Sequence, residues 1–98
     1  MNLSEHQKKY LRGLGHRLKP LLMIGDAGLS ESLLAEYEST LSHHELIKVK
    51  LRSDRDARSA WTDQIANQCG AERVHSIGQV SCFYRRNADE PVITLPDA

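Results

Sequence analysis

Hydrophobic and polar positions along the chain predict seven elements of secondary structure. Apolar residues recur at helical spacing in three segments, and at strand spacing or as short apolar runs in four others. The order helix, strand, helix, strand, helix, strand, strand implies two right-handed crossovers followed by a hairpin. We therefore predict an α/β fold, a mixed four-stranded sheet packed with helices. The helices are expected over residues 4–14, 30–42 and 56–69, and the strands over residues 21–24, 46–52, 72–77 and 80–85.

Local signals mark the ends of the predicted helices. Ser4, with Gln7 three residues later, fits a capping box, in which each side chain accepts a hydrogen bond from the other residue's backbone N–H. Ser30 is placed to cap the second helix, and Gly70 lies where a helix commonly ends in a left-handed residue.

Two strands show patterns that predict their burial. The apolar run over 21–24 indicates a strand buried on both faces, as in a parallel sheet. In the strand over 46–52, apolar and basic residues alternate strictly from the second residue onward. Successive side chains of a strand face opposite sides of the sheet. The core side is expected to hold Ile47, Val49 and Leu51, and the other side Lys48, Lys50 and Arg52.

The last third of the chain carries a turn signal and a terminal apolar segment. Gly78-Gln79 suits a two-residue type II′ hairpin turn between the last two strands. The segment 91–96 is bounded by prolines and is expected to dock as a short edge strand.

Composition narrows the class of protein. The 98 residues suffice for one domain, and we take 1–98 as a single domain. With 40% apolar and 27% charged residues, a disordered tail, a membrane protein and a fibre are excluded. The start shows no secretory signal, so the two isolated cysteines, Cys69 and Cys82, are expected to be reduced small fillers in a cytoplasmic protein.

The net charge of zero conceals an uneven distribution. Residues 1–25 carry five basic residues and one acidic residue, whereas 87–98 carry three acidic residues and no basic one. The body of the chain is therefore basic, and the acidic end is expected to be a loosely docked tail. A neutral total argues only against strong nonspecific attraction to polyanions.

The loop Gly25-Asp26-Ala27-Gly28 is the first candidate site, because it lies between a predicted strand and a predicted helix. Glycines allow close approach of the backbone, and free amides at a helix start attract phosphate. The loop lacks the lysine of a Walker loop but matches the GxxG loop that clamps nucleic-acid backbone in KH-type domains. A plain tight turn stays open as an alternative, which the carboxylate of Asp26 favours.

The basic row on the predicted strand is the second candidate. Lys48, Lys50 and Arg52 follow one another at about 6.6 Å, a spacing that suits an RNA backbone. A solvated face of an open sheet explains the row equally well. Lys19 extends this basic surface, and Arg85 beside Tyr84 offers a place where a base could stack, although such a tyrosine is more often half core.

Catalysis and metal binding find no support in the sequence. His43 and His44 are adjacent, and no second cluster at metal-ligand spacing accompanies them. No nucleophile, base and orienting group can be assembled. We therefore expect neither an enzyme nor a cofactor.

Four motifs together resemble the CRM domain, whose name stands for chloroplast RNA splicing and ribosome maturation. They are Leu18-Lys19-Pro20, the glycine loop continuing to Ser30, the run His43-His44-Glu45-Leu46-Ile47-Lys48-Val49-Lys50, and Ile77-Gly78-Gln79 with Tyr84-Arg85. The chain is most similar to the stand-alone bacterial YhbY-type ribosome-associated form of the family. The likeness covers nearly the whole chain in the same order.

This resemblance implies a fold and a function. The fold would be an α/β RNA-binding domain related in shape to the C-terminal domain of a bacterial translation initiation factor. The function would be association with precursors of the large ribosomal subunit, with the glycine loop facing ribosomal RNA. Separately, we expect the protein to be a monomer. Two alternatives stay open: a protein-binding adaptor of the translation machinery, and a small nucleotide-binding module. The candidate RNA contacts are Lys19, Gly25, Asp26, Ala27, Gly28, Lys48, Lys50, Arg52 and Arg85.

Overall fold

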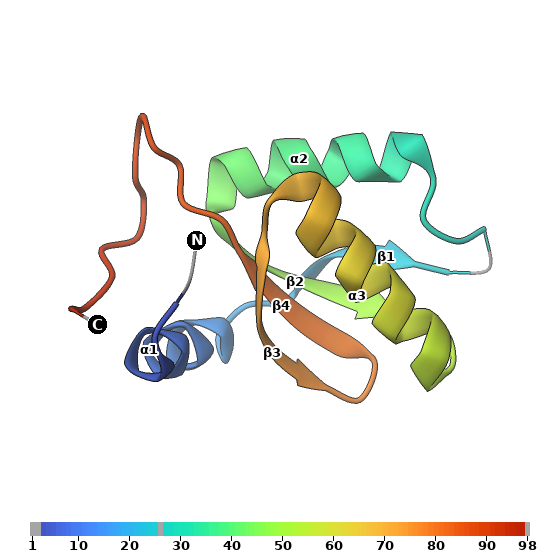
Figure 1. The fold of residues 1–98 in the computed structure, drawn as a ribbon, viewed down its shortest axis with the longest axis horizontal. Coiled ribbons are helices and arrows are strands. Elements are labelled where there is room, and N and C mark those ends of the chain that lie inside the picture. Colours follow the sequence, from blue (N-terminus) through green and yellow to red (C-terminus); the bar gives the residue numbers. More distant parts are fainter. Residues whose placement is uncertain (1–2, 26, 98) are drawn as a thin grey trace.

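The seven elements occur in the predicted order in the computed structural model, which describes residues 3–25 and 27–97 (Figure 1). Each helix or strand lies within two residues of its predicted bounds at either end. The elements are α1 (Glu5–Gly15), β1 (Pro20–Ile24), α2 (Glu31–His44), β2 (Leu46–Leu51), α3 (Arg55–Cys69), β3 (Glu72–Ile77) and β4 (Val80–Tyr84).

The strands form one mixed sheet in the order β1-β2-β4-β3. β1 runs parallel to β2, and β4 is antiparallel to both β2 and β3. Helices α2 and α3 pack on one face, over a core that includes Ile47, Val49 and Phe83. Helix α1 packs on the other face, over a smaller core that includes Leu11 and Tyr84. The predicted fold class, a mixed four-stranded sheet packed with helices, is confirmed.

Capping side chains begin all three helices. The Ser4 hydroxyl accepts from the Gln7 N–H at 3.1 Å and the Gln7 side chain accepts from the Ser4 N–H at 3.1 Å, so the predicted capping box is present. Ser30 caps α2 as predicted. Asp54 caps α3, which therefore starts one residue earlier than expected, and Gly70 ends it with a φ of 65°.

The prediction that β1 is buried on both faces is wrong. β1 is an edge strand, and only Ile24 is fully buried. Leu21 and Met23 are 52% and 51% exposed, because α1 packs over β2 and β3 and leaves β1 uncovered on that side. The apolar run thus has one covered face, on which Leu22 and Ile24 pack against the larger core.

The alternation predicted for β2 is confirmed. Ile47, Val49 and Leu51 are at most 1% exposed, whereas Lys48 is half-buried and Lys50 is exposed on the α1 side. Leu46 shares that side with the lysines yet is buried, because it belongs to the smaller core beneath α1. The polar side of this strand is therefore open only toward its carboxyl end.

The hairpin turn agrees with a type II′ geometry. Gly78 has a φ of 57°, and Glu45 is the only non-glycine residue of the described chain with a positive φ, so Gln79 is negative. A type I′ turn would need positive φ at both central residues.

The segment after β4 forms no strand within its described part, so the predicted edge strand over 91–96 is wrong. Its backbone N–H groups instead reach the buried carboxylate of Glu45, which accepts from Asn87, Val92 and Ile93. Further along, the Gln7 side-chain amide donates to the Pro96 carbonyl at 3.0 Å, which joins the tail to α1. The tail thus docks through side-chain acceptors and donors rather than through a sheet ladder.

Buried thiol and phenol groups are expected to make the stability of the fold depend on alkaline pH. Burial raises the pKa of Cys69, Cys82, Tyr37 and Tyr84 above their ordinary values, which are 9.0 for cysteine and 10.0 for tyrosine. The unfolded chain therefore loses these protons at a pH where the folded chain keeps them. Their contribution to stability is complete below about pH 9 and is lost as the pH rises further.

We expect the urea midpoint of unfolding to be clearly lower at about pH 10 than at about pH 8. Tyr37→Phe provides the matched variant, because the buried Tyr37 hydroxyl has no hydrogen-bond partner among the described residues. The variant should unfold near the wild-type midpoint at pH 8 and lose less stability at pH 10. Equal pH dependence of the two proteins would contradict the assignment to Tyr37.

Candidate nucleic-acid interface

The glycine loop forms a tight turn between β1 and α2, and Gly25 and Gly28 are half-buried. The Gly28 N–H donates to the Gly25 carbonyl at 2.9 Å, and Gly28 adopts a φ of 73°, where side chains are strained. A β-carbon added at either glycine would meet nothing within 4 Å, so the backbone here faces open space. Ala27 is exposed. The predicted contact Asp26 lies outside the described residues.

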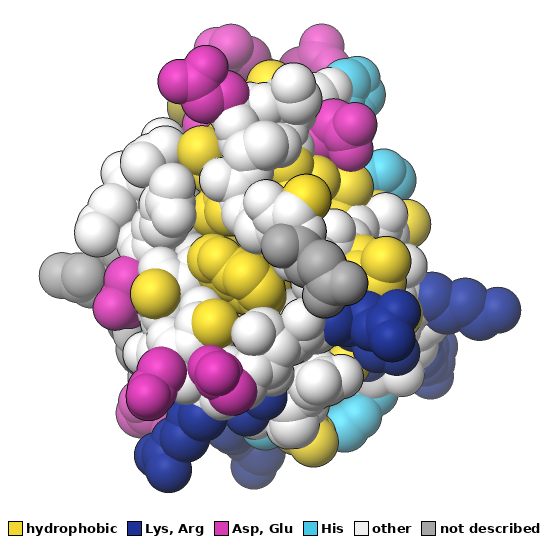
Figure 2. Space-filling view, turned by 90° about the vertical axis from the view of Figure 1, so that its right-hand side faces the viewer, with side chains coloured by type: hydrophobic (Ala, Val, Ile, Leu, Met, Phe, Trp, Pro, Cys, Tyr) yellow, Lys and Arg dark blue, Asp and Glu magenta, His cyan; other side chains and the backbone are white. Residues whose placement is uncertain are grey.

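The structure brings Arg52 to the glycine loop. The Arg52 N–H donates to the Ile24 carbonyl at 2.8 Å, which extends the β1–β2 pairing past the end of β2. Arg52 and Gly25 consequently line the same hollow, at the end of the molecule shown in Figure 2. Met23, Ser53 and Gln79 complete its lining. Two predicted site residues that are distant in sequence are thus neighbours in space.

The two lysines of the basic row lie on the open α1 side of the sheet. In the register of β1 and β2, Lys48 is opposite Pro20 and Lys50 is opposite Met23. Lys19 is exposed just before β1. Among residues 3–25 and 27–97, Lys19, Lys48, Lys50 and Arg52 form no ion pair. Lys19, Lys50 and Arg52 are also exposed, whereas Lys48 is half-buried.

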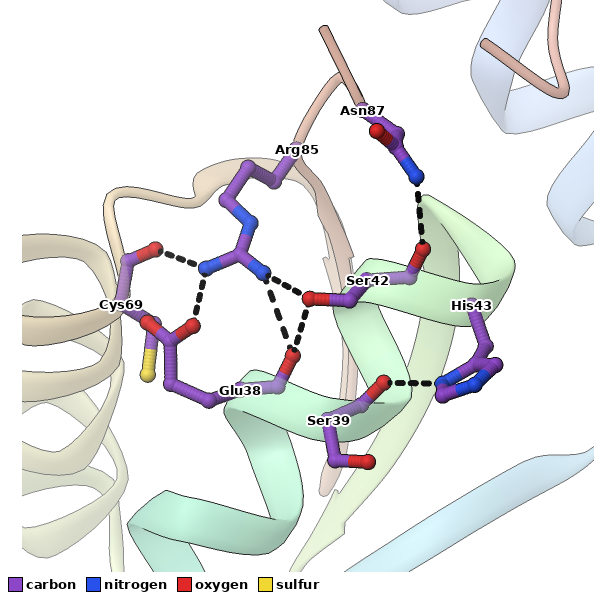
Figure 3. A network of polar contacts seen from close by, with 7 residues as sticks. All are labelled: Glu38, Ser39, Ser42, His43, Cys69, Arg85 and Asn87. Atoms are coloured by element: carbon purple, nitrogen blue, oxygen red, sulfur yellow. Dashed lines mark hydrogen bonds and ion pairs between the residues drawn. The ribbon is translucent and has the colours of Figure 1, made fainter. Parts of the chain in front are cut away.

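Arg85 occupies a different environment, because its guanidinium is engaged inside the fold (Figure 3). Nη1 donates to the Glu38 carboxylate at 2.6 Å and to the Cys69 carbonyl at 2.9 Å. Nη2 donates to the Glu38 carbonyl at 3.1 Å and to the Ser42 hydroxyl at 2.8 Å. Arg85 thereby ties the end of β4 to α2 and α3, at a distance from the glycine loop.

Tyr84 is fully buried rather than half-buried, with 1% of its surface exposed. It belongs to the core beneath α1 and offers no ring face for stacking. The structure therefore does not bring Tyr84 and Arg85 together with the loop and the lysines.

His43, near the end of α2, contacts the backbone of its own helix. His43 Nδ1 lies 2.8 Å from the Ser39 carbonyl within the same helix. The described part of the chain contains no group of three His, Cys, Asp or Glu side chains that could hold a metal ion.

No described helix has both the length and the apolar character needed to cross a membrane.

The sequence analysis did not bring three further arginines together, because they come from two elements that are distant in the chain. Arg55 and Arg58 lie one turn apart on α3, and Arg73 lies on β3. All three line a second hollow, between α3 and the β3–β4 hairpin. The i, i+3 spacing of the first two was a visible signal, but the position of Arg73 depends on how the hairpin packs.

Known proteins resemble this chain over nearly its whole length. The family model described as the CRS1 / YhbY (CRM) domain matches residues 3–85. A Pseudomonas aeruginosa protein named as a probable RNA-binding protein is 46% identical over 88 residues, covering 89% of this chain and 85% of that protein. A Haemophilus influenzae protein named as an RNA-binding protein is 43% identical over 95 residues, covering 96% and 95%.

A solved structure has the same fold. The solution structure of a hypothetical Staphylococcus aureus protein, described as a candidate for RNA binding, superposes with a TM-score of 0.82. The sequence identity is 31%, and the match covers 97% of this chain and 100% of that one.

Proposed function

The chain belongs to the CRS1 / YhbY (CRM) domain family, and we propose that it is an RNA-binding protein. The observation that carries the proposal is the glycine loop beside the cation of Arg52, with open space where a β-carbon would lie at Gly25 and Gly28. The relatives named as RNA-binding proteins support RNA as the ligand.

The chemistry of binding follows from two kinds of donor. The first kind is the set of backbone N–H groups at the α2 N-terminus that the fold does not already use; the Gly28 N–H donates to the Gly25 carbonyl and the Leu33 N–H to the Ser30 hydroxyl. Lys19, Lys50 and Arg52 neutralise phosphates and release counterions, which supplies affinity without sequence preference. Lys48 is half-buried, and its charge adds to the positive electrostatic potential of this surface.

We propose further that the RNA is ribosomal and that the protein associates, as a monomer, with precursors of the large ribosomal subunit. The resemblance to the YhbY-type form supports this partner. In a density gradient of cell extract, the protein should co-migrate with large-subunit precursors at low salt and leave them at high salt. Migration only with free protein at low salt would contradict the proposed partner while leaving RNA binding itself open to direct titration.

RNA affinity is expected to fall steeply with salt. If about four phosphates of a single strand are contacted, the logarithm of the association constant should fall against the logarithm of salt concentration with a slope of about −3. Filter-binding titrations at several salt concentrations measure this slope. A slope near zero would exclude the electrostatic interface.

Substitution at Gly28 separates a ligand loop from a plain turn. Gly28→Asp and Gly28→Asn have nearly the same shape, and both tolerate the positive φ of this position better than other side chains. Only the aspartate adds a negative charge where a phosphate would lie. We expect Gly28→Asp to bind RNA about tenfold more weakly than Gly28→Asn, at one fixed salt concentration.

The comparison holds once circular dichroism shows equal fold content. Equal affinities of the two Gly28 variants would identify the loop as a plain turn.

We also propose that the protein does not hydrolyse nucleotides, because the loop lacks the lysine and hydroxyl that hold phosphates and Mg²⁺ in a P-loop. Protein-dependent ATP or GTP hydrolysis by purified protein would contradict this.

A further inference from the structure

The hollow between α3 and the β3–β4 hairpin is lined mainly by arginines and by residues with hydroxyl groups. Arg55, Arg58 and Arg73 contribute guanidinium groups, and Asp63 is the only acidic side chain in the lining. Among the described residues none of the three arginines forms an ion pair. A guanidinium group can donate two parallel hydrogen bonds to the oxygens of a phosphate. The three arginines therefore suit a phosphodiester better than an uncharged sugar.

The floor of this groove is polar. In the register of β3 and β4, Arg73 is opposite Phe83 and Ser76 is opposite Ser81, which places these side chains on the face covered by α3. The Ser76 and Ser81 hydroxyls lie 2.8 Å apart, and Ser81 is only 4% exposed. Ser76 is exposed, so its hydroxyl can also bond to a sugar or phosphate oxygen, and the lining of the groove contains no aromatic ring on which a base could stack.

The groove adjoins the hollow at the glycine loop. Gly78 lines the groove and its neighbour Gln79 lines the glycine-loop hollow, so the hairpin turn separates the two. Arg58 Nη1 donates to the Ser53 carbonyl at 2.6 Å, and Ser53 lines the glycine-loop hollow. Figure 2, which views this end of the molecule, shows Lys and Arg side chains at its lower left and at its right, with Asp and Glu side chains beside those at the lower left.

We infer that the groove between α3 and the β3–β4 hairpin is a second binding site for RNA backbone. A strand held at the glycine loop passes the Gly78–Gln79 turn and continues into the groove, where Arg55, Arg58 and Arg73 bind its phosphates. This route lies on the α3 face of the sheet, opposite the face that carries Lys48 and Lys50. The inference rests on the proposed function, because it extends the RNA beyond the loop.

The test compares two double variants that remove the same charge. Arg55→Gln with Arg73→Gln removes two groove cations, and Lys9→Gln with Arg86→Gln removes two exposed cations that line neither hollow. A single-stranded RNA of about 20 nucleotides is titrated at several salt concentrations. We expect the groove variant to bind about tenfold more weakly and its salt slope to shrink by about 1.4, at about 0.7 per phosphate contact.

The control variant should keep the wild-type slope. If the groove variant matches the control in affinity and slope while Gly28→Asp still weakens binding, the groove is not a site and the proposed function stands. If the wild-type protein fails to bind RNA, both proposals fall. A second readout is direct: addition of RNA should shift the backbone amide signals of Ser76 and Ser81, and unchanged signals at saturation would overturn the inference.

Discussion

Replacing Glu45 with alanine is expected to lower the free energy of unfolding by about 3 kcal/mol. The carboxylate is fully buried and accepts from the N–H groups of Asn87, Val92 and Ile93 at 2.7, 2.9 and 2.6 Å. A hydrogen bond to a charged group contributes about 1.5–3 kcal/mol, and release of the tail to water offsets part of the loss. Urea unfolding of the purified protein measures the change.

Two further variants separate the causes. Glu45 has a φ of 61°, so Glu45→Gly loses the same bonds but relieves backbone strain, and it should be about 1 kcal/mol more stable than Glu45→Ala. In a chain ending at Arg86, where the tail is absent, Glu45→Ala should cost much less than in the full chain. Equal costs in the two chains would show that the carboxylate does not hold the tail.

Replacing Arg85 with alanine is expected to destabilise the fold by about 2–3 kcal/mol. The substitution removes four hydrogen bonds that join β4 to α2 and α3, and it leaves the Glu38 carboxylate without its cation (Figure 3). Glu38 is partly exposed, so the ion pair itself contributes little and the bonds to the Cys69 carbonyl and the Ser42 hydroxyl contribute more. Arg85→Lys should recover only part of the loss, because an ammonium group cannot reproduce the planar fork.

RNA binding by Arg85→Ala distinguishes a structural role from a direct contact. At a temperature where the variant remains folded, its RNA affinity should equal that of the wild type, whereas Lys50→Ala should bind more weakly at unchanged stability. If Arg85→Ala lost RNA affinity without any loss of stability, Arg85 would be a direct RNA contact.

Features set by neighbouring residues could be predicted from the sequence. The capping box at Ser4 and Gln7, the cap at Ser30 and the alternation along β2 depend on contacts within a few residues. The meeting of Gly25 and Arg52 was also within reach, because both follow parallel strands, and the carboxyl ends of parallel neighbours share one edge of the sheet.

Features set by distant partners could not be predicted. The exposure of Leu21 and Met23 depends on where α1 lies, and an apolar run alone does not reveal which faces are covered. The sequence does not reveal the ion pair of Arg85, because its partner Glu38 lies 47 positions away. The arginines of the groove become a set only once the hairpin packs beside α3.

The hydrogen bond between the Gln7 side chain and the Pro96 carbonyl has a practical consequence for engineering the chain. It places α1 beside the described part of the tail, at the end of the molecule opposite the glycine loop (Figure 1). A fluorophore attached to an exposed residue of α1 or of the tail would therefore lie away from the proposed RNA path.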